Sequence, residues 1–374
     1  MKRSAHNSRR QTGFPAAARN VLAAVLMAAS AGCSSNSAPG GGPPPPADNR
    51  VLGIAANPRE VPPPVPQDYL DAAALVRGAG VRGTIQTDTW SVLEPAPGQY
   101  ALQDLQNGLN FAASQGLQAY VGIQVINTVP KTVPSDLMGV NWNDPQMESR
   151  FHALLDAILP LLGNQVTYLS IGNEVDVYLT AHPAEWTSYE GFYEDALAYI
   201  HQKSPGIRVG VTTTFTGASG AARANVALLN SRSDLWIFTY YPLGAGFVPN
   251  SPQSPLTDFP TMLTLAGTKD VALQEVGYPS STAISSSEAN QASFVTAFFQ
   301  AWQNTGQRIP FLSFFLLHDL TPSICSQLNA YYGVPPDPAF QAYLCTLGLR
   351  HDDDTLKPAW AAFVNAAAAN GFPH

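Results

Sequence analysis

Two short stretches decide the fold of this chain: Val166-Thr-Tyr-Leu-Ser-Ile-Gly-Asn-Glu174-Val-Asp176 and Asp270-Val-Ala-Leu-Gln-Glu275-Val-Gly-Tyr278-Pro279. Each begins as an apolar run and turns polar at a glutamate. Such runs are typical of parallel strands that are buried on both faces. Because parallel α/β barrels keep their chemistry at the carboxyl ends of the strands, we expect Glu174 and Glu275 to lie in an active site. The alternative, a glutamate that only ends a strand and points to solvent, is less favoured for two glutamates than for one.

A pair of carboxyl groups facing each other across a cleft suits a particular chemistry. One group attacks an anomeric carbon, and the other protonates the departing oxygen of a glycosidic bond. In retaining enzymes the two groups lie about 5–5.5 Å apart, against about 6.5–9.5 Å in inverting ones. We expect retention of the anomeric configuration here.

Apolar runs and helical patterns alternate along the rest of the chain. Eight short, β-rich runs occur at 51–55, 81–86, 118–124, 166–171, 208–213, 235–240, 270–274 and 311–317. Helical patterns separate several of these runs or follow the last, at 69–78, 102–115, 147–162, 191–203, 286–304 and 358–370. This alternation predicts an α/β fold, a (β/α)₈ TIM barrel that forms a single domain over 49–374. In this numbering Glu174 ends the fourth strand and Glu275 ends the seventh.

Composition excludes several classes of function. The net charge of −8, with 12% charged residues among 374, argues against nucleic acid, which requires clustered Lys and Arg. A neutral polysaccharide or oligosaccharide partner needs no such complementarity. The chain has no Gly-x-Ser-x-Gly and no His-Glu-x-x-His motif, and the run from His351 to Asp354 lacks the spacing and glycine of a calcium loop. We therefore predict an enzyme without metal or other cofactor.

The N-terminal region predicts export. Basic residues precede a short apolar stretch at 21–29, so residues 1–32 resemble a lipoprotein signal peptide rather than a membrane span. Ser30-Ala-Gly-Cys33 resembles a bacterial lipobox, with Cys33 as the lipidation site, although Ser30 replaces the usual leucine. Residues 33–48 are rich in proline, glycine and serine and predict a flexible tether. We expect a monomer that a lipid anchor alone holds at the outer membrane, in the periplasm or at the cell surface.

Two cysteines remain in the predicted domain, Cys325 and Cys345. In an exported protein such a pair favours a disulfide over a metal site, and two free buried thiols are the alternative. The bridge would tie down a long connection after the eighth strand, over 319–344. We expect this connection to form one wall of a catalytic cleft and to have too sparse a packing of its own to hold itself in place.

Several motifs resemble the retaining TIM-barrel glycoside hydrolases of clan A. Gly172-Asn173-Glu174-Val175 is similar to the Asn-Glu motif of the clan's fourth strand. Gln274-Glu275-Val-Gly-Tyr278-Pro-Ser is similar to the Glu-x-Gly-Trp-Pro-Ser motif of family 17 β-1,3-glucanases, with a tyrosine in place of the tryptophan. The stretch from Trp90 to Tyr100 resembles the segment Trp-x-x-x-Glu-Pro-x-x-Gly-x-Tyr after the second strand. Family 17, family 158 and, more distantly, the family 53 galactanases are the families that the chain resembles.

The resemblance implies a role for each matching residue. Glu174 would be the acid/base, Glu275 the nucleophile, and Asn173 a partner of the sugar 2-hydroxyl group. A tyrosine at the end of the sixth strand, Tyr241 or Tyr240, would hydrogen-bond the nucleophile. Clan members often place a tryptophan at the end of the eighth strand, where this chain has Phe315 and His318. Further candidates for contact with the sugar are Trp90, Asn127 and Tyr278.

The function that follows is hydrolysis of a β-linked polysaccharide with retention, and more narrowly an endo-β-glucanase. Two alternatives remain. One is a transglycosylase of the same fold, which would pass the glycosyl unit to another sugar. The other is a non-catalytic sugar-binding lipoprotein, against which the presence of both carboxylates counts.

Overall fold

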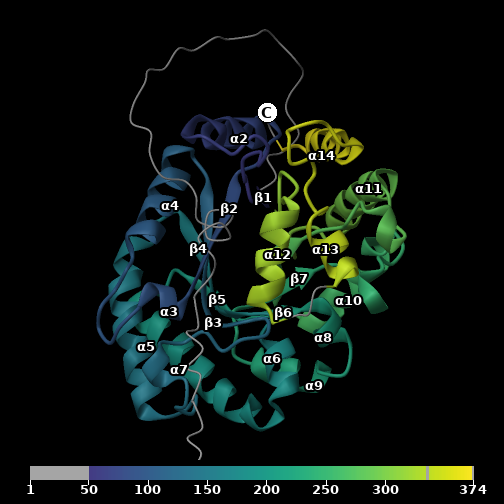
Figure 1. The fold of residues 1–374 in the computed structure, drawn as a ribbon. Helices are drawn as coiled ribbons and strands as arrows, with labels where there is room; N and C mark the ends of the chain where they lie inside the picture. The colour runs from purple at the N-terminus through teal and green to yellow at the C-terminus, as the bar shows by residue number, and fades with distance from the viewer. Residues whose placement is uncertain (1–49, 334–336, 373–374) are drawn as a thin grey trace, which may run out of the picture.

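The computed structural model describes residues 50–333 and 337–372, and its centre is a sheet of parallel strands (Figure 1). The strands hydrogen-bond in the order β5-β4-β3-β2-β1-β9-β8-β7-β6. Their bounds are β1 (Val51–Ile54), β2 (Gly83–Thr89), β3 (Gln118–Asn127), β4 (Val166–Asn173), β5 (Arg208–Gly210), β6 (Thr212–Thr214), β7 (Leu235–Tyr240), β8 (Asp270–Val276) and β9 (Phe311–Phe314). Every neighbouring pair in this order is parallel.

The two ends of the sheet belong to one predicted strand. Val211 alone separates β5 from β6; β5 pairs with β4, and β6 pairs with β7. The fifth predicted strand therefore occurs as two short pieces that close the ring between the fourth and sixth. Counted in this way the sheet is a barrel of eight strands, and the predicted (β/α)₈ fold is confirmed.

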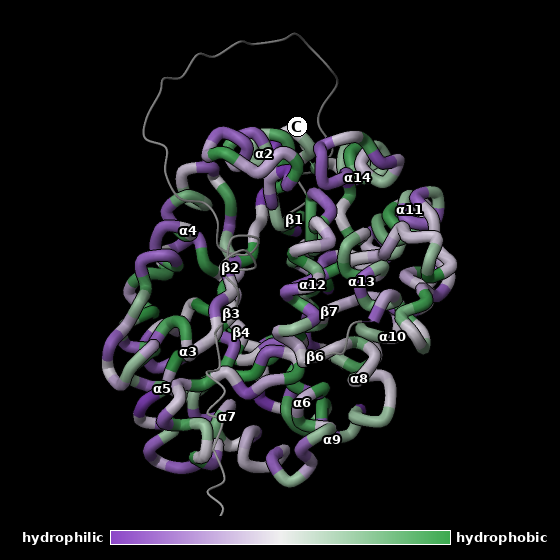
Figure 2. Tube along the Cα trace, in the orientation of Figure 1, coloured by the Kyte–Doolittle hydropathy of each residue, from purple (hydrophilic) through white to green (hydrophobic). Residues whose placement is uncertain are grey.

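Helices surround the barrel, and six of the main ones lie where the sequence pattern predicts a helix. The main ones are α2 (Pro66–Gly78), α4 (Gln103–Ser114), α5 (Pro145–Ile158), α7 (Trp186–Lys203), α10 (Pro255–Ala266), α11 (Glu288–Asn304) and α14 (Pro358–Ala369). The shorter ones are α3 (Trp90–Leu93), α6 (Val175–Ala181), α8 (Phe215–Ser219), α9 (Arg223–Leu229), α12 (Pro322–Tyr331) and α13 (Pro338–Leu344). Hydrophilic and hydrophobic stretches alternate along the outer helices, as expected for helices with one face on a core (Figure 2).

The core has two layers that follow from the alternation of side chains along each strand. Inward-facing residues fill the barrel itself: Val51, Ile85, Tyr120, Tyr168, Leu235, Ile237, Ala272 and Phe311. A larger cluster lies between the strands and the helices and includes Leu169, Phe238 and Leu273. The interior is thus packed with side chains, so a ligand site can form only at an end of the barrel.

The segment after β9 forms a separate small unit, which we call the cap and define as α12 and α13. The two helices lie side by side (Figure 1). A disulfide joins Cys325 of α12 to Cys345, with the two Cα atoms 6.0 Å apart. The cap and the residues that flank it share a buried cluster: Leu316, Leu320, Ile324, Cys325, Leu328, Phe340, Leu344 and Leu347. The disulfide is as predicted, but the expectation of sparse packing was wrong, because these helices pack their apolar faces against each other.

The predicted signal peptide (1–32), the lipidation site Cys33 and the tether (33–48) lie outside the described residues. In the part of the chain that is described, no helix combines the length and apolarity needed to cross a bilayer.

Candidate active site

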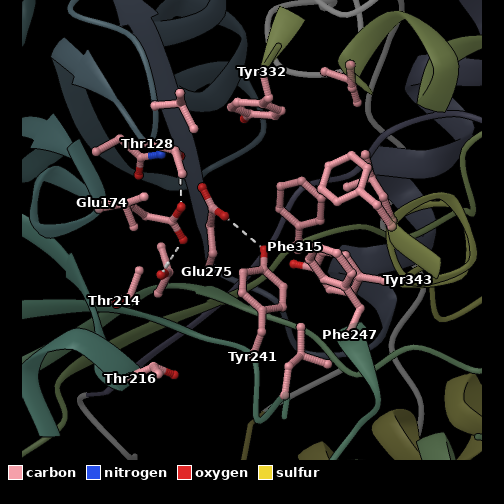
Figure 3. Close-up of a pocket in the computed structure, with 18 of the residues that line it drawn as sticks. Thr128, Glu174, Thr214, Thr216, Tyr241, Phe247, Glu275, Phe315, Tyr332 and Tyr343 are labelled. Carbon is pink, nitrogen blue, oxygen red and sulfur yellow. Dashed lines mark hydrogen bonds between the residues drawn. The ribbon is translucent and has the colours of Figure 1, made fainter. Parts of the chain in front are cut away.

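A cavity of 590 Å³ opens at the carboxyl ends of the barrel strands, and both predicted catalytic glutamates line it. Figure 3 shows the carboxyl groups of Glu174 and Glu275 next to each other, facing the open space. Glu174 follows the last residue of β4, and Glu275 lies near the end of β8. Two segments about 100 residues apart in the sequence therefore meet in one site, as their positions on the fourth and seventh barrel strands predict.

The backbone around Glu174 is bent so that its side chain enters the cavity. Glu174 has φ 47° and ψ 43°, a left-handed conformation that is costly for a residue with a side chain. Two residues earlier, Gly172 has φ 87°, and a Cβ atom there would collide with Val175 and with the hydroxyl group of Tyr189. The Gly-Asn-Glu motif thus serves a physical purpose: glycine permits the turn that directs both Asn173 and Glu174 toward the site.

An irregularity in the pairing of β8 directs the side chain of Glu275 into the cavity. The pairing of β8 with β7 runs from Phe238↔Leu273 to Thr239↔Glu275, which leaves Gln274 as an extra residue. A bulge of this kind lets two consecutive side chains point to the same side of a sheet. Gln274 contacts residues inside the barrel, and Glu275 reaches the cavity just above it.

Each carboxylate accepts two hydrogen bonds from side chains. Glu174 accepts from the hydroxyl groups of Thr239 (2.6 Å) and Thr128 (2.7 Å). Glu275 accepts from the hydroxyl group of Tyr241 (2.8 Å) and from the amide Nε2 of Gln274 (3.1 Å). Of the two tyrosines predicted for this role, Tyr241 contacts the carboxylate.

Burial and mutual repulsion keep a proton on this pair near neutral pH. Desolvation, together with the nearby charge of Glu174, raises the pKa of Glu275 to about 7, although the hydrogen bonds from Tyr241 and Gln274 oppose the shift. Desolvation also raises the pKa of Glu174. Two carboxylates this close cannot both ionise easily, so the pair retains one proton over a range in which isolated glutamates have lost theirs.

The hydrogen-bond partners indicate which glutamate carries that proton. The amide nitrogen of Gln274 can only donate, so it favours an ionised Glu275. The hydroxyl groups of Thr128 and Thr239 can donate or accept, so either one can receive a hydrogen bond from a protonated Glu174. The contact with Gln274 thus favours charge on Glu275, against the effect of burial and of the Glu174 charge on the pKa of this group.

A chain of amide hydrogen bonds fixes the residues between the two glutamates. Gln274 Nε2 donates to Asn173 Oδ1 (2.9 Å), and its Oε1 accepts from Tyr120 (2.8 Å). Asn173 Nδ2 donates to Asn127 Oδ1 (3.1 Å), whose Nδ2 donates to the hydroxyl group of Tyr331 (3.1 Å). The chain runs from the barrel interior to the cap and holds Asn127 and Asn173 at the cavity floor.

The side of the cavity opposite the two carboxylates is apolar. We call it the apolar wall, and it consists of Leu243, Phe247, Phe315, Leu320, Leu328, Phe340 and Leu344. The cap and its flanking residues supply Leu320, Leu328, Phe340 and Leu344. Rings pack closely here: Phe247 lies 5.2 Å from Phe340 between centroids. The predicted role of the 319–344 segment as one wall of the cleft is confirmed.

Four of the other predicted site residues line the cavity: Asn127, Asn173, Tyr241 and Phe315. Phe315 takes the place expected for the strand-eight aromatic residue, and its ring meets that of Tyr241 edge-on at 5.9 Å.

Four predicted sugar-contacting residues lie elsewhere. Trp90 is fully buried, donates to Glu94 (2.8 Å) and packs on Phe151, so it belongs to the core. The hydroxyl group of Tyr240 donates to Asp258 (2.7 Å) on the helix side of β7, because consecutive strand residues face opposite sides.

Tyr278 and His318 also face away from the cavity. Tyr278 is 3% exposed and donates to the carbonyl of Asn250 (2.7 Å). His318 is held between the carbonyl of Asn57 (2.7 Å) and Asp354 (2.8 Å). Both connect loops around the barrel rim and support the site's surroundings without lining it.

Sequence reasoning missed several residues that complete the site. Thr128 and Thr239 contact Glu174, Gln274 contacts Glu275, and Tyr332 and Tyr343 line the cavity from the cap. Alternation along β7 carried a signal for Thr239, since it precedes the outward-facing Tyr240 by one residue. Thr128 and the cap tyrosines depend on loop geometry, which no local pattern encodes.

Within the described ranges, no three His, Cys, Asp or Glu side chains are grouped as metal ligands would be.

Comparison with known proteins finds similarity in structure only. No family model matches the sequence, and no curated protein matches it either. A GH5_18 protein (glycoside hydrolase family 5, subfamily 18) from Bifidobacterium longum subsp. infantis superposes with a TM-score of 0.65 at 16% identity over 86% of this chain and 79% of its own. A GH5_18 structure from Streptomyces cattleya in complex with GlcNAc gives 0.65 at 16% identity, over 87% and 81%. The exo-β-1,4-mannosidase Op5Man5 from Opitutaceae bacterium strain TAV5 gives 0.62 at 17% identity, over 81% and 56%.

At these identities the likeness shows the fold alone. The neighbours are glycoside hydrolases on TIM barrels, in agreement with the predicted clan A architecture. The narrower resemblance to families 17, 158 and 53 stays a prediction.

Proposed function

We propose that this chain is a retaining β-glycoside hydrolase in which Glu275 is the nucleophile and Glu174 the acid/base. One observation carries the proposal: the glutamates that end the fourth and seventh barrel strands lie side by side in one cavity, with Tyr241 donating to Glu275. A binding protein gains nothing from two adjacent carboxyl groups, one of which has its pKa raised to about 7 by burial and by the charge of the other.

The chemistry follows from the two protonation states. Ionised Glu275 attacks the anomeric carbon while neutral Glu174 gives its proton to the departing glycosidic oxygen, and a glycosyl ester forms on Glu275. Glu174, now a carboxylate, then takes a proton from a water molecule that attacks the same carbon. The C–O bond to Glu275 breaks, and Glu275 leaves as a carboxylate. Two inversions give net retention.

Asn173 and Asn127 supply the polar contacts for the sugar ring. Asn173 uses Oδ1 and Nδ2 in the amide chain, each of which has capacity for one more hydrogen bond. A sugar 2-hydroxyl group beside the nucleophile would form a hydrogen bond with Asn173. This hydrogen bond would strengthen as positive charge develops at the anomeric carbon.

The identity of the sugar is open to a direct experiment. The motif resemblance favours internal cleavage of a β-glucan. The solved neighbours instead include a protein in complex with Manβ1-4GlcNAc and an exo-β-1,4-mannosidase, which favour a short β-mannoside. The panel should therefore hold laminarin, mixed-linkage glucan, galactan, mannan and xylan together with Manβ1-4GlcNAc and simple β-glucosides and β-mannosides.

Reducing-sugar release from this panel by wild-type protein, with Glu275→Gln as the control, tests the proposal. We expect release from at least one substrate and none above background for the variant. Products longer than the substrate would assign transfer to another sugar instead of hydrolysis. Equal release by both proteins, or none on any β-glycoside, would overturn the proposal.

A further inference from the structure

The two sides of the cavity differ in what they can offer a substrate. Around the carboxylates the lining is polar: Gln124, Asn127, Thr128, Asn173, Thr214, Thr216 and Thr239. The apolar wall consists of seven leucine and phenylalanine side chains with no polar atom. Both belong to the same 590 Å³ space, which is within the range of about 300–1,000 Å³ that encloses a drug-sized ligand and is more than one sugar ring occupies.

Few hydroxyl groups reach the wall side. Tyr241 donates to Glu275, and the hydroxyl group of Tyr332 is hydrogen-bonded to Thr128. Tyr343 stacks on Phe247 at 5.6 Å, and its hydroxyl group points toward the carboxylates (Figure 3). All three therefore serve the polar side of the cavity. Lys, Arg and His are absent from the described lining.

A second sugar ring would fit this wall poorly. Sugars bind to aromatic rings through their C–H faces, but the hydroxyl groups around the rim then need polar partners at the edge of the ring. A hydroxyl group that loses water without gaining a partner weakens binding about tenfold. An alkyl or acyl chain has no such requirement, and each methylene group that it buries strengthens binding about fourfold.

We propose that the apolar wall binds an apolar group of the substrate, so that the natural substrate is an amphiphilic β-glycoside. The inference rests on the proposed function for the position of the sugar ring. The apolar group belongs either to the aglycone, as in an alkyl glycoside, or to the sugar, as in an acylated glycoside. The wall's chemistry is common to both, and the two are distinguished by the choice of probe.

Binding to the Glu275→Gln protein tests the inference without depending on turnover. The probes are octyl, methyl and 6-O-octanoyl methyl β-glucosides, the corresponding β-mannosides, and the disaccharides cellobiose and Manβ1-4GlcNAc, titrated by calorimetry below any micelle concentration. We expect octyl or octanoyl probes to bind at least about 50-fold more tightly than the methyl glycoside, as burial of three or more methylene groups requires. A gain with the octyl probe alone assigns the wall to the aglycone, and a gain with the octanoyl probe alone assigns it to the sugar.

A substitution in the wall locates the effect. Phe247 is half-buried at the cavity edge, and Phe247→Ser should reduce the octyl-to-methyl affinity ratio at least about fivefold. Its neighbour Val248 is 40% exposed and does not line the cavity, so Val248→Ser is the matched control and should keep the ratio. Octyl and octanoyl probes that bind within threefold of the methyl glycoside, or disaccharides that bind more tightly than both, would overturn the inference. The proposed function would survive that result, because the panel assay tests it separately.

Discussion

The active site has a floor, formed by the ends of the barrel strands, and a cap, and different interactions hold the two together. The floor consists of side chains at the ends of β3, β4, β7 and β8, and the parallel hydrogen bonding of the barrel fixes their relative positions. The cap consists of two short helices that hold together through a small apolar cluster and one disulfide. The floor carries the two carboxylates, whereas the cap contributes mainly apolar surface and the hydroxyl group of Tyr331, which accepts from Asn127. We therefore expect the chemistry to depend on the floor and substrate choice to depend on the cap.

The floor should show the largest response to a single substitution. Glu275→Gln keeps the shape of the side chain and removes the nucleophile, so we expect turnover to fall by at least about 10⁴-fold. Initial rates on the best substrate of the panel measure the loss, and circular dichroism verifies that the fold is intact. A loss smaller than about tenfold in a folded variant would place the nucleophile elsewhere.

Glu174→Gln should reduce turnover by less than Glu275→Gln does, and the size of the loss should depend on the leaving group of the substrate. Loss of a general acid reduces turnover by about 10²–10⁴-fold. A glycosyl fluoride needs little help from an acid, so the first step with this substrate should be much less affected. Equal losses for a fluoride and an alkyl glycoside would show that Glu174 does not act as the proton donor.

The cap offers a contrasting test through its disulfide. Cys325 and Cys345 lie 20 residues apart, and closing a loop of this length stabilises by about 3 kcal/mol in the chain-entropy model. We expect the Cys325→Ala/Cys345→Ala variant to lose activity at a temperature below that at which the barrel unfolds. Activity and far-UV circular dichroism, followed together on heating, measure the gap. Loss of both signals at one temperature would mean that cap and barrel unfold as a unit.

The smallest expected effect is on the free energy of unfolding, which the buried carboxyl group of Glu275 lowers at high pH. The pKa of Glu275 is raised from 4.5 to about 7 in the folded protein. Between these pH values the folded glutamate pair holds a proton that the unfolded chain does not, so the pair makes stability fall as pH rises through the window. Glu275→Gln removes the dependence and should stabilise the protein by about 1–3 kcal/mol at pH 8 but not at pH 4. Thermal unfolding at both pH values measures the difference, and an equal shift at pH 4 would point to a cause other than ionisation.

The same comparison explains which features the sequence could predict. Apolar runs that end in Glu174 and Glu275 predicted the barrel and the floor, because each strand's place in the ring follows from its order in the chain. The fourth and seventh strands then meet at one end whatever the loops do. Sequence also paired Cys325 with Cys345, because they are the two cysteines in the predicted domain.

Residues whose positions do not follow from the order of the barrel strands could not be predicted in this way. Trp90 and Tyr278 lie in recognisable motifs, yet burial turns them toward the core and the rim. The choice between Tyr240 and Tyr241 depended on where β7 ends, and one residue decides which face a side chain takes. The bulge at Gln274 and the left-handed backbone of Glu174 are tertiary features, as is the contact of Thr128 with Glu174.

Trapping the glycosyl-enzyme tests the central claim most directly. A 2-deoxy-2-fluoro glycoside with a good leaving group and the preferred sugar should slow the second step and leave the sugar attached to the nucleophile. Peptide mapping by mass spectrometry is then expected to find the added mass on the peptide that contains Glu275, and no label in Glu275→Gln. A label on Glu174 or on any other residue, or hydrolysis whose first product has the inverted anomeric configuration, would contradict the account.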